Sequence, residues 1–160
     1  MNWLDTVAIL AIIAIASLEA WRKFGKALFD VVGGLLAIHV AHAAQPGLAA
    51  LVSFSADPDT NQAASFATVF VVLAALTVIA SKYLYNVTLL ALPDAFEGFG
   101  GAVLGIVSGV VVAHAIVWMV FTSAGGDVRS NPYKGTLAVN ELVQWDTYHQ
   151  ALDSLKHLGE

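Results

Sequence analysis

Four long runs of hydrophobic residues divide the chain, and each is too long for a β-strand. They cover Leu4–Trp21, Ala27–Ala44, Ala63–Ser81 and Phe99–Thr122. A helix needs about 20 residues to cross a hydrocarbon core about 30 Å thick. It also satisfies its own backbone hydrogen bonds, as a lipid environment requires. The pattern predicts an all-α, polytopic membrane protein with four transmembrane helices.

Two further segments are amphipathic. Tyr83–Leu92 combines aromatic residues with the neighbouring Lys82 and ends at Pro93, which is typical of a segment at the membrane interface. Near the C-terminus, one hydrophobic stripe with helical spacing predicts an amphipathic helix. The stripe consists of Leu142, Trp145, Tyr148, Leu152 and Leu155. We expect a membrane domain over residues 1–124, then a linker and tail over 125–160 that lie on the outer membrane surface or against a partner.

The composition supports a membrane location. Hydrophobic residues make up 58% of the chain and charged residues 12%, whereas soluble domains carry about 25% charged residues. The net charge of −5 argues against nucleic-acid binding, which needs a basic surface. The absence of cysteine excludes disulfides and thiolate metal sites. No phosphate-binding loop, zinc-protease or serine-hydrolase motif occurs, so we expect no enzymatic activity.

The basic residues predict the orientation in the membrane. Four of the seven follow the first and third hydrophobic runs: Arg22, Lys23, Lys26 and Lys82. The loop after the second run, residues 45–62, has none, and two basic residues, Arg129 and Lys134, follow the fourth run. By the positive-inside rule, the loops after the first and third runs are cytoplasmic. We therefore expect a multi-pass protein of the bacterial inner membrane with both termini in the periplasm.

Three local patterns resemble the colicin V production protein family. They are "NWLD" at Asn2–Asp5, the basic turn "WRKFG" at Trp21–Gly25, and Asp94 followed by glycines at about four-residue steps. The resemblance extends over about residues 2–120. It implies a small bacterial inner-membrane protein with about four spans, tied to colicin V production and envelope stress. The family brings no established enzymatic mechanism with it.

The glycines of the fourth run predict close helix packing. They are Gly98, Gly101, Gly105 and Gly109. Small residues at this spacing form one stripe that lets two membrane helices approach closely, within one protomer or between two. The alternative is that the stripe lines a pore or ligand cleft. Asp94 and Glu97 precede this stripe, where acidic residues stabilise the N-terminal end of a helix.

Three histidines lie in the hydrophobic runs. From cytoplasmic ends at Ala27 and Phe99, the helical rise places His42 and His114 each about 22 Å along their helices, and His39 about 18 Å. We expect His42 and His114 at one level, in the outer half of the bilayer. Three roles fit: a hydrogen-bonded pin between helices, a ligand of haem or (bacterio)chlorophyll, or a proton relay. We favour the pin, and no cofactor is required.

Charged residues near the ends of the first two runs predict interfacial ion pairs. Asp30 lies within reach of water or of Lys26, four residues earlier. Glu19 lies close to Arg22 and Lys23.

Two classes of function follow. The first is a free-standing membrane protein that acts by protein–protein interaction in envelope or export processes. The second is an accessory transmembrane subunit of a larger energy-converting complex, photosynthetic or respiratory, in which the histidines touch a pigment or haem. The expected partners are the lipid bilayer and either further copies of the chain or a larger membrane complex.

Overall fold

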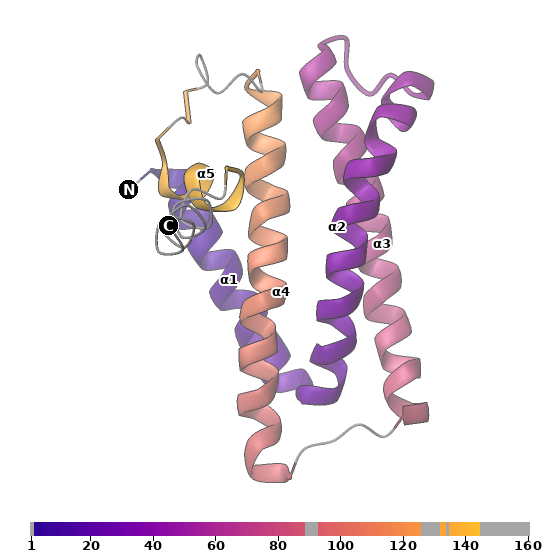
Figure 1. Cartoon of the computed structure of the whole chain (residues 1–160), viewed down its shortest axis with the longest axis vertical. Coiled ribbons are helices and arrows are strands. Elements are labelled where there is room, and N and C mark those ends of the chain that lie inside the picture. Colours follow the sequence, from indigo (N-terminus) through magenta and orange to yellow (C-terminus); the bar gives the residue numbers. More distant parts are fainter. Residues whose placement is uncertain (1, 89–92, 126–131, 134, 145–160) are drawn as a thin grey trace, which may run out of the picture.

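The computed structural model describes residues 2–88, 93–125, 132–133 and 135–144 (Figure 1). Within these ranges the chain forms five helices: α1 (Trp3–Arg22), α2 (Phe24–Leu51), α3 (Pro58–Thr88), α4 (Asp94–Ser123) and α5 (Leu137–Leu142). The first four are long and apolar enough to cross a membrane. The all-α membrane fold with four spans is therefore confirmed.

The helices extend beyond the hydrophobic runs that predicted them. α2 continues through Pro46 to Leu51, although Pro46 lacks the N–H that would bond to the His42 carbonyl. α3 continues through Tyr83–Thr88, the first part of the segment expected at the interface. Because no proline or glycine occurs between Ser81 and Pro93, nothing in the sequence stops the helix at Ser81. Residues 89–92 lie outside the described residues.

The four long helices form two pairs. α1 packs chiefly against α4 and α2 against α3, and the contact between α2 and α4 joins the pairs (Figure 1). A single residue, Lys23, separates α1 from α2 and has a left-handed backbone with φ of 72°. Its N–H donates to the Glu19 carbonyl at 2.9 Å, which ends α1. This tight turn places the charged end of α1 directly beside the first turns of α2.

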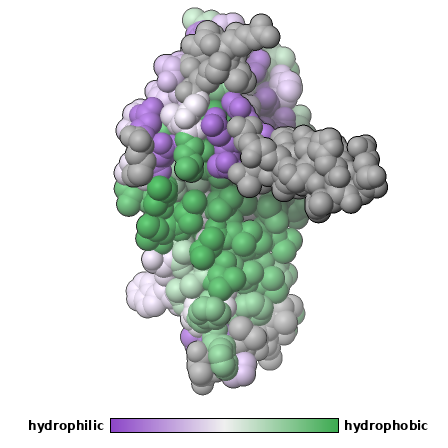
Figure 2. All heavy atoms as spheres, turned by 60° about the vertical axis from the view of Figure 1, so that its left-hand side comes forward, coloured by the Kyte–Doolittle hydropathy of each residue, from purple (hydrophilic) through white to green (hydrophobic). Residues whose placement is uncertain are grey.

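The two ends of the bundle differ in their connections. The start of α1, the connection between α2 and α3, and the end of α4 lie toward one end, while the α1–α2 turn, the end of α3 and the start of α4 lie toward the other (Figure 1). Figure 2 shows a band of hydrophobic residues across the middle of one face, with hydrophilic residues gathered above it. This arrangement fits helices that cross a bilayer in alternating directions.

The buried hydrophobic residues in the described ranges form two clusters. One joins α1, α4 and α5 through Leu4, Ala8, Ala113, Val117, Phe121, Ala138 and Val139. The other joins α2, α3 and α4 through Ala37, Ala41, Phe66, Phe70, Val111 and Ala115. The chain after α4 thus returns to the bundle at α5, where the Ala138 N–H donates to Asp5 Oδ1 at 2.8 Å. Leu142 of the predicted amphipathic stripe ends α5, and the remainder of that stripe lies outside the described residues.

Candidate functional site

The glycine stripe of α4 lies against α1 of the same chain. A Cβ atom at Gly105 would lie 2.7 Å from the Ala16 Cα, and one at Gly109 would lie 2.8 Å from the Ile12 Cα. A Cβ at Gly101 would overlap the Glu19 carbonyl group. Gly98 is less crowded, because its nearest contact would be the Ala20 carbonyl oxygen at 3.6 Å. Three of the four predicted packing glycines thus permit backbone contact between α1 and α4.

A second close approach was not predicted. Gly33 of α2 faces α3, and a Cβ there would overlap the Thr77 side chain. A Cβ at Gly34, the next residue, would lie 3.8 Å from Val111 Cγ1 of α4. The adjacent glycines in the second hydrophobic run were the available signal, since paired small residues allow a helix to approach neighbours on two sides.

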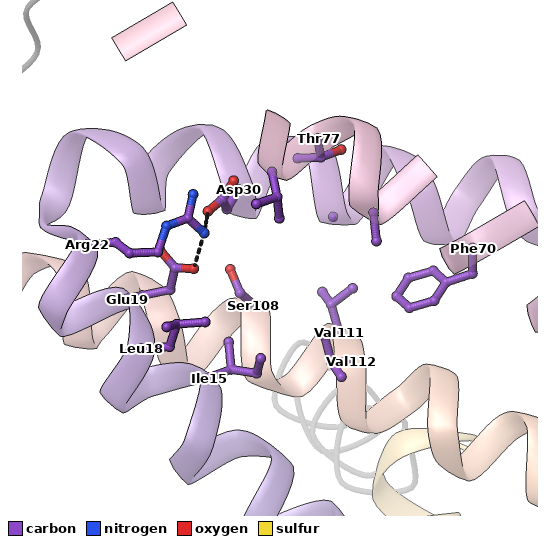
Figure 3. Close-up of a pocket in the computed structure, with 13 residues that line it drawn as sticks. Ile15, Leu18, Glu19, Arg22, Asp30, Phe70, Thr77, Ser108, Val111 and Val112 are labelled. Carbon is purple, nitrogen blue, oxygen red and sulfur yellow. Dashed lines mark hydrogen bonds and ion pairs between the residues drawn. The ribbon is translucent and has the colours of Figure 1, made fainter. Parts of the chain in front are cut away.

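Arg22 connects three helices in a buried charge cluster. Its Nη1 donates to Glu19 Oε1 at 2.9 Å and also contacts Asp30 Oδ2. Its Nη2 donates to Ser81 Oγ at 3.0 Å. The cluster thereby ties the end of α1 to the second turn of α2 (Figure 3) and, through Ser81, to α3.

Asp30 forms an ion pair as expected, but its partner is Arg22 and not Lys26. The turn at Lys23 brings Arg22 to the Asp30 carboxylate, and the Lys26 ammonium lies instead 5.3 Å from the centroid of the Tyr85 ring. The expected proximity of Glu19 to Arg22 is found.

A cavity of about 110 Å³ adjoins this cluster, between the two helix pairs. Its polar lining comes from Glu19, Arg22, Asp30, Thr77 and Ser108, and the remaining lining residues are mostly aliphatic. Figure 3 shows the side chain of Ser108, which lies on α4, directed toward the carboxylates of Glu19 and Asp30. Ser108 Oγ, Glu19 Oε2 and Asp30 Oδ1 are buried and have no hydrogen-bond partner within the part of the chain that the structure describes. The cavity therefore presents polar groups whose hydrogen bonds are incomplete.

The structure brings together two of the three membrane histidines. His42 Nε2 lies 3.3 Å from His114 Nε2, and His114 Nδ1 contacts the Leu142 carbonyl of α5. Because a carbonyl only accepts, the proton of neutral His114 lies on Nδ1, and its Nε2 accepts from His42 Nε2–H. The His42 ring also packs against Phe66 and Trp118, with centroids 4.7 and 4.9 Å away. This arrangement is that of a pin between α2, α4 and α5.

The His42–His114 geometry does not fit an axially ligated metal between the two rings. Imidazole nitrogens bind metals at about 2.0–2.1 Å, so two opposed ligands require a separation of about 4 Å. At 3.3 Å the two Nε2 atoms bond to each other. The described residues also contain no group of three or more metal-binding side chains. Ligation of a haem or pigment by His39, His42 or His114 stays a prediction that this geometry does not favour.

His39 lies apart from the pair and is exposed. It lines a groove of about 450 Å³ between α2 and α4, together with Leu35, Ile38, Val110 and the other two histidines. The groove is predominantly aliphatic, and its polar groups are the three imidazoles.

The comparison with protein families agrees with this fold. The model of the colicin V production protein family matches residues 4–142, which include all five helices except the first residue of α1. The chain belongs to the colicin V production protein family. No curated protein and no solved structure matches it. Membership makes the chain a multi-pass membrane protein of a family not known to be enzymatic.

Proposed function

We propose that this chain is a non-enzymatic protein of the bacterial inner membrane that acts by protein–protein interaction in envelope or export processes, as a pair of identical copies. The observation that carries the proposal is the exposed imidazole of His39. At the helical rise His39 lies about 22 Å along an α2 that is about 42 Å long, which places it at the middle of the span.

An imidazole at this depth needs a partner. Ionisable residues within spans almost always face the bundle interior or pair with another group, because an unsatisfied polar group in hydrocarbon costs several kcal/mol. Among the described residues His39 has no hydrogen-bond partner. The exposed hydroxyls of Ser17 and Thr68, by contrast, donate to carbonyls of their own helices. His39 therefore marks the face of α2 that another chain covers.

A second copy of the chain satisfies this requirement most simply. In a twofold-symmetric interface the same surface meets itself, so a residue on the axis must bond to its own copy. A neutral imidazole has one donor and one acceptor, and the His42–His114 contact shows two such rings bonded within this fold. Around His39, exposed aliphatic side chains of α2 supply the packing surface: Leu35, Leu36 and Val40.

Cysteine cross-linking tests the pair directly, because the chain has no cysteine of its own. Leu35→Cys lies one turn before His39 and is 49% exposed; Val72→Cys on α3 is 53% exposed and serves as the control. In native membranes Leu35→Cys should form a disulfide-linked dimer in high yield, and adding His39→Leu should reduce that yield.

The control defines the result that would contradict the proposal. A Leu35→Cys dimer yield no higher than that of Val72→Cys would show that this face meets no second copy. A yield unaffected by His39→Leu would remove His39 from the interface. Cross-linking of Leu35→Cys to a different membrane protein instead would favour the accessory-subunit role over the pair.

The orientation proposed with this function has both termini in the periplasm. It rests on the basic residues at the end of the bundle that carries the α1–α2 turn, and it places the linker and tail over residues 125–160 on the periplasmic side. Asp59 at the start of α3 and Lys26 at the start of α2 lie at opposite ends of the bundle. In whole cells a membrane-impermeant thiol reagent should label Asp59→Cys and not Lys26→Cys; the reverse pattern would invert the orientation.

A further inference from the structure

The charge cluster between the helix pairs is not neutral when every member is ionised. Two carboxylates, Glu19 and Asp30, contact the same nitrogen of a single guanidinium, Arg22. Both carboxylates are buried, with side chains 4% and 7% exposed. Removing an ion from water costs several kcal/mol unless an opposite charge compensates it. One of the two negative charges has no such partner among the groups that line the cavity.

The other titratable groups nearby do not supply the missing charge. On α2, Lys26 lies over the Tyr85 ring of α3. Lys23 in the turn is exposed. On α3 the groups facing the cluster are the hydroxyls of Thr77 and Ser81, which are uncharged. On α4 the cavity is lined by Ser108, and the buried Glu97 is not among its lining residues.

The unfilled hydrogen bonds identify what is missing. Glu19 Oε2 and Asp30 Oδ1 are buried acceptors that receive no hydrogen bond from the described residues, and an ionised carboxylate can only accept. Ser108 is 7% exposed, and its Oγ also has no hydrogen-bond partner in the described ranges. Its hydroxyl points into the same cavity from α4 (Figure 3). One proton on either carboxyl would add a donor, remove the surplus charge and leave the guanidinium paired with the other carboxylate.

We propose that this cavity is a proton-binding site in which Glu19 and Asp30 share one proton at neutral pH, with Ser108 as a hydrogen-bond partner. The site holds the proton between α1, α2 and α4, so it joins the two helix pairs. Arg22 is the most exposed member, with its side chain 19% exposed, and lies at the end of α1. Exchange with the aqueous phase therefore occurs at that end of the bundle. Release of the proton would oppose two like charges in a low-dielectric site and weaken the contact between the pairs.

Infrared spectroscopy of the full-length protein in lipid vesicles tests the shared proton. The wild-type protein at pH 7 should show the carbonyl stretch of a protonated carboxylic acid. Glu19→Gln and Asp30→Asn each leave one carboxylate opposite Arg22, so each variant should lose that band. Both substitutions preserve side-chain shape and leave one carboxylate paired with the guanidinium, and circular dichroism verifies that the helices remain. Asp59→Asn serves as the control, because Asp59 lies at the start of α3, away from the cluster, and it should leave the band unchanged.

Three results would overturn the proposal. The first is a wild-type spectrum without the band. The second is loss of the band in only one of the two variants, which would place the proton on a single residue rather than on the pair. The third is loss of the wild-type band when Na⁺ replaces choline in the buffer, which would make a metal cation the ligand. Ser108→Ala should shift the band without abolishing it, because it removes a hydrogen-bond partner and no charge; an unchanged band frequency would remove Ser108 from the site.

Discussion

Adding a single methyl group to the glycine stripe of α4 should show whether the backbones of α1 and α4 pack closely or make an ordinary contact through side chains. In Gly105→Ala the new Cβ would lie 2.7 Å from the Ala16 Cα and 2.8 Å from the Glu19 Cβ. Carbon atoms pack best at about 3.5–4.0 Å, so α1 must move away by a substantial fraction of an ångström. Gly98→Ala provides the matched control, because its nearest contact would be an oxygen at 3.6 Å.

The comparison between the two variants isolates the packing cost. Each gains about 1 kcal/mol of helix propensity from the change of glycine to alanine, and this gain cancels when they are compared. Overpacking of a close contact costs about 1–3 kcal/mol. We therefore expect Gly105→Ala to have a free energy of unfolding about 1–3 kcal/mol lower than that of Gly98→Ala.

Reversible unfolding in mixed micelles, followed by far-ultraviolet circular dichroism, measures this difference. Because the stripe is covered by α1 of the same chain, Gly105→Ala should leave the cross-linking yield of Leu35→Cys unchanged. Equal unfolding free energies for the two alanine variants would refute the close approach of α4 to α1. A loss of the dimer without a loss of stability would mean that the stripe packs against a second copy instead.

Three further predictions concern the caps and the histidines. Asp5→Ala removes the acceptor of the buried Ala138 N–H, and an unsatisfied buried donor costs about 1–3 kcal/mol. Amide hydrogen exchange in α5 should therefore accelerate, while exchange in α3 stays constant. An exchange rate in α5 equal to that of the wild-type protein would show that Asp5 does not hold α5 in place. The hydroxyl of Thr60, and to a lesser extent its N–H, donates to the Asp57 carboxylate and lowers the pKa of Asp57 below the ordinary 3.8. This cap therefore stabilises the fold above pH about 4, and the stabilisation is lost as pH falls through the lowered pKa. In Asp57→Ala the Tm should no longer show this decrease at acidic pH. A dependence of Tm on pH that matches that of the wild-type protein would contradict the role of the cap. The purified protein should show no haem absorption, because the His42 and His114 rings bond to each other; an absorption band that disappears in His114→Leu would contradict this.

The spans and the histidine level could be predicted because they depend on regular quantities. A hydrophobic run identifies a membrane helix whatever its neighbours are, and the fixed rise per residue placed His42 and His114 at the same depth. The ends of the helices could not be predicted in this way. α2 and α3 continue well past their hydrophobic runs, since polar residues outside the hydrocarbon core remain good helix formers.

The contacts of the charged residues depend on geometry that hydropathy does not encode. The single-residue turn at Lys23 decides that Asp30 meets Arg22 rather than Lys26. In the same way, α5 docks on α1 and α4 through Ala138 and Val139, two small side chains that carry no amphipathic signal. Both features arise when separate segments meet in three dimensions, and a pattern along one segment cannot reveal them.

The mass of the assembled protein tests the proposed pair most directly. Native mass spectrometry of the wild-type protein released from lipid nanodiscs should give twice the chain mass of 16.8 kDa. His39→Leu, prepared at the same ratio of protein to lipid, should give the mass of a single chain. A wild-type protein that is released only as single chains, or a dimer that persists in His39→Leu, would contradict a pair joined through His39.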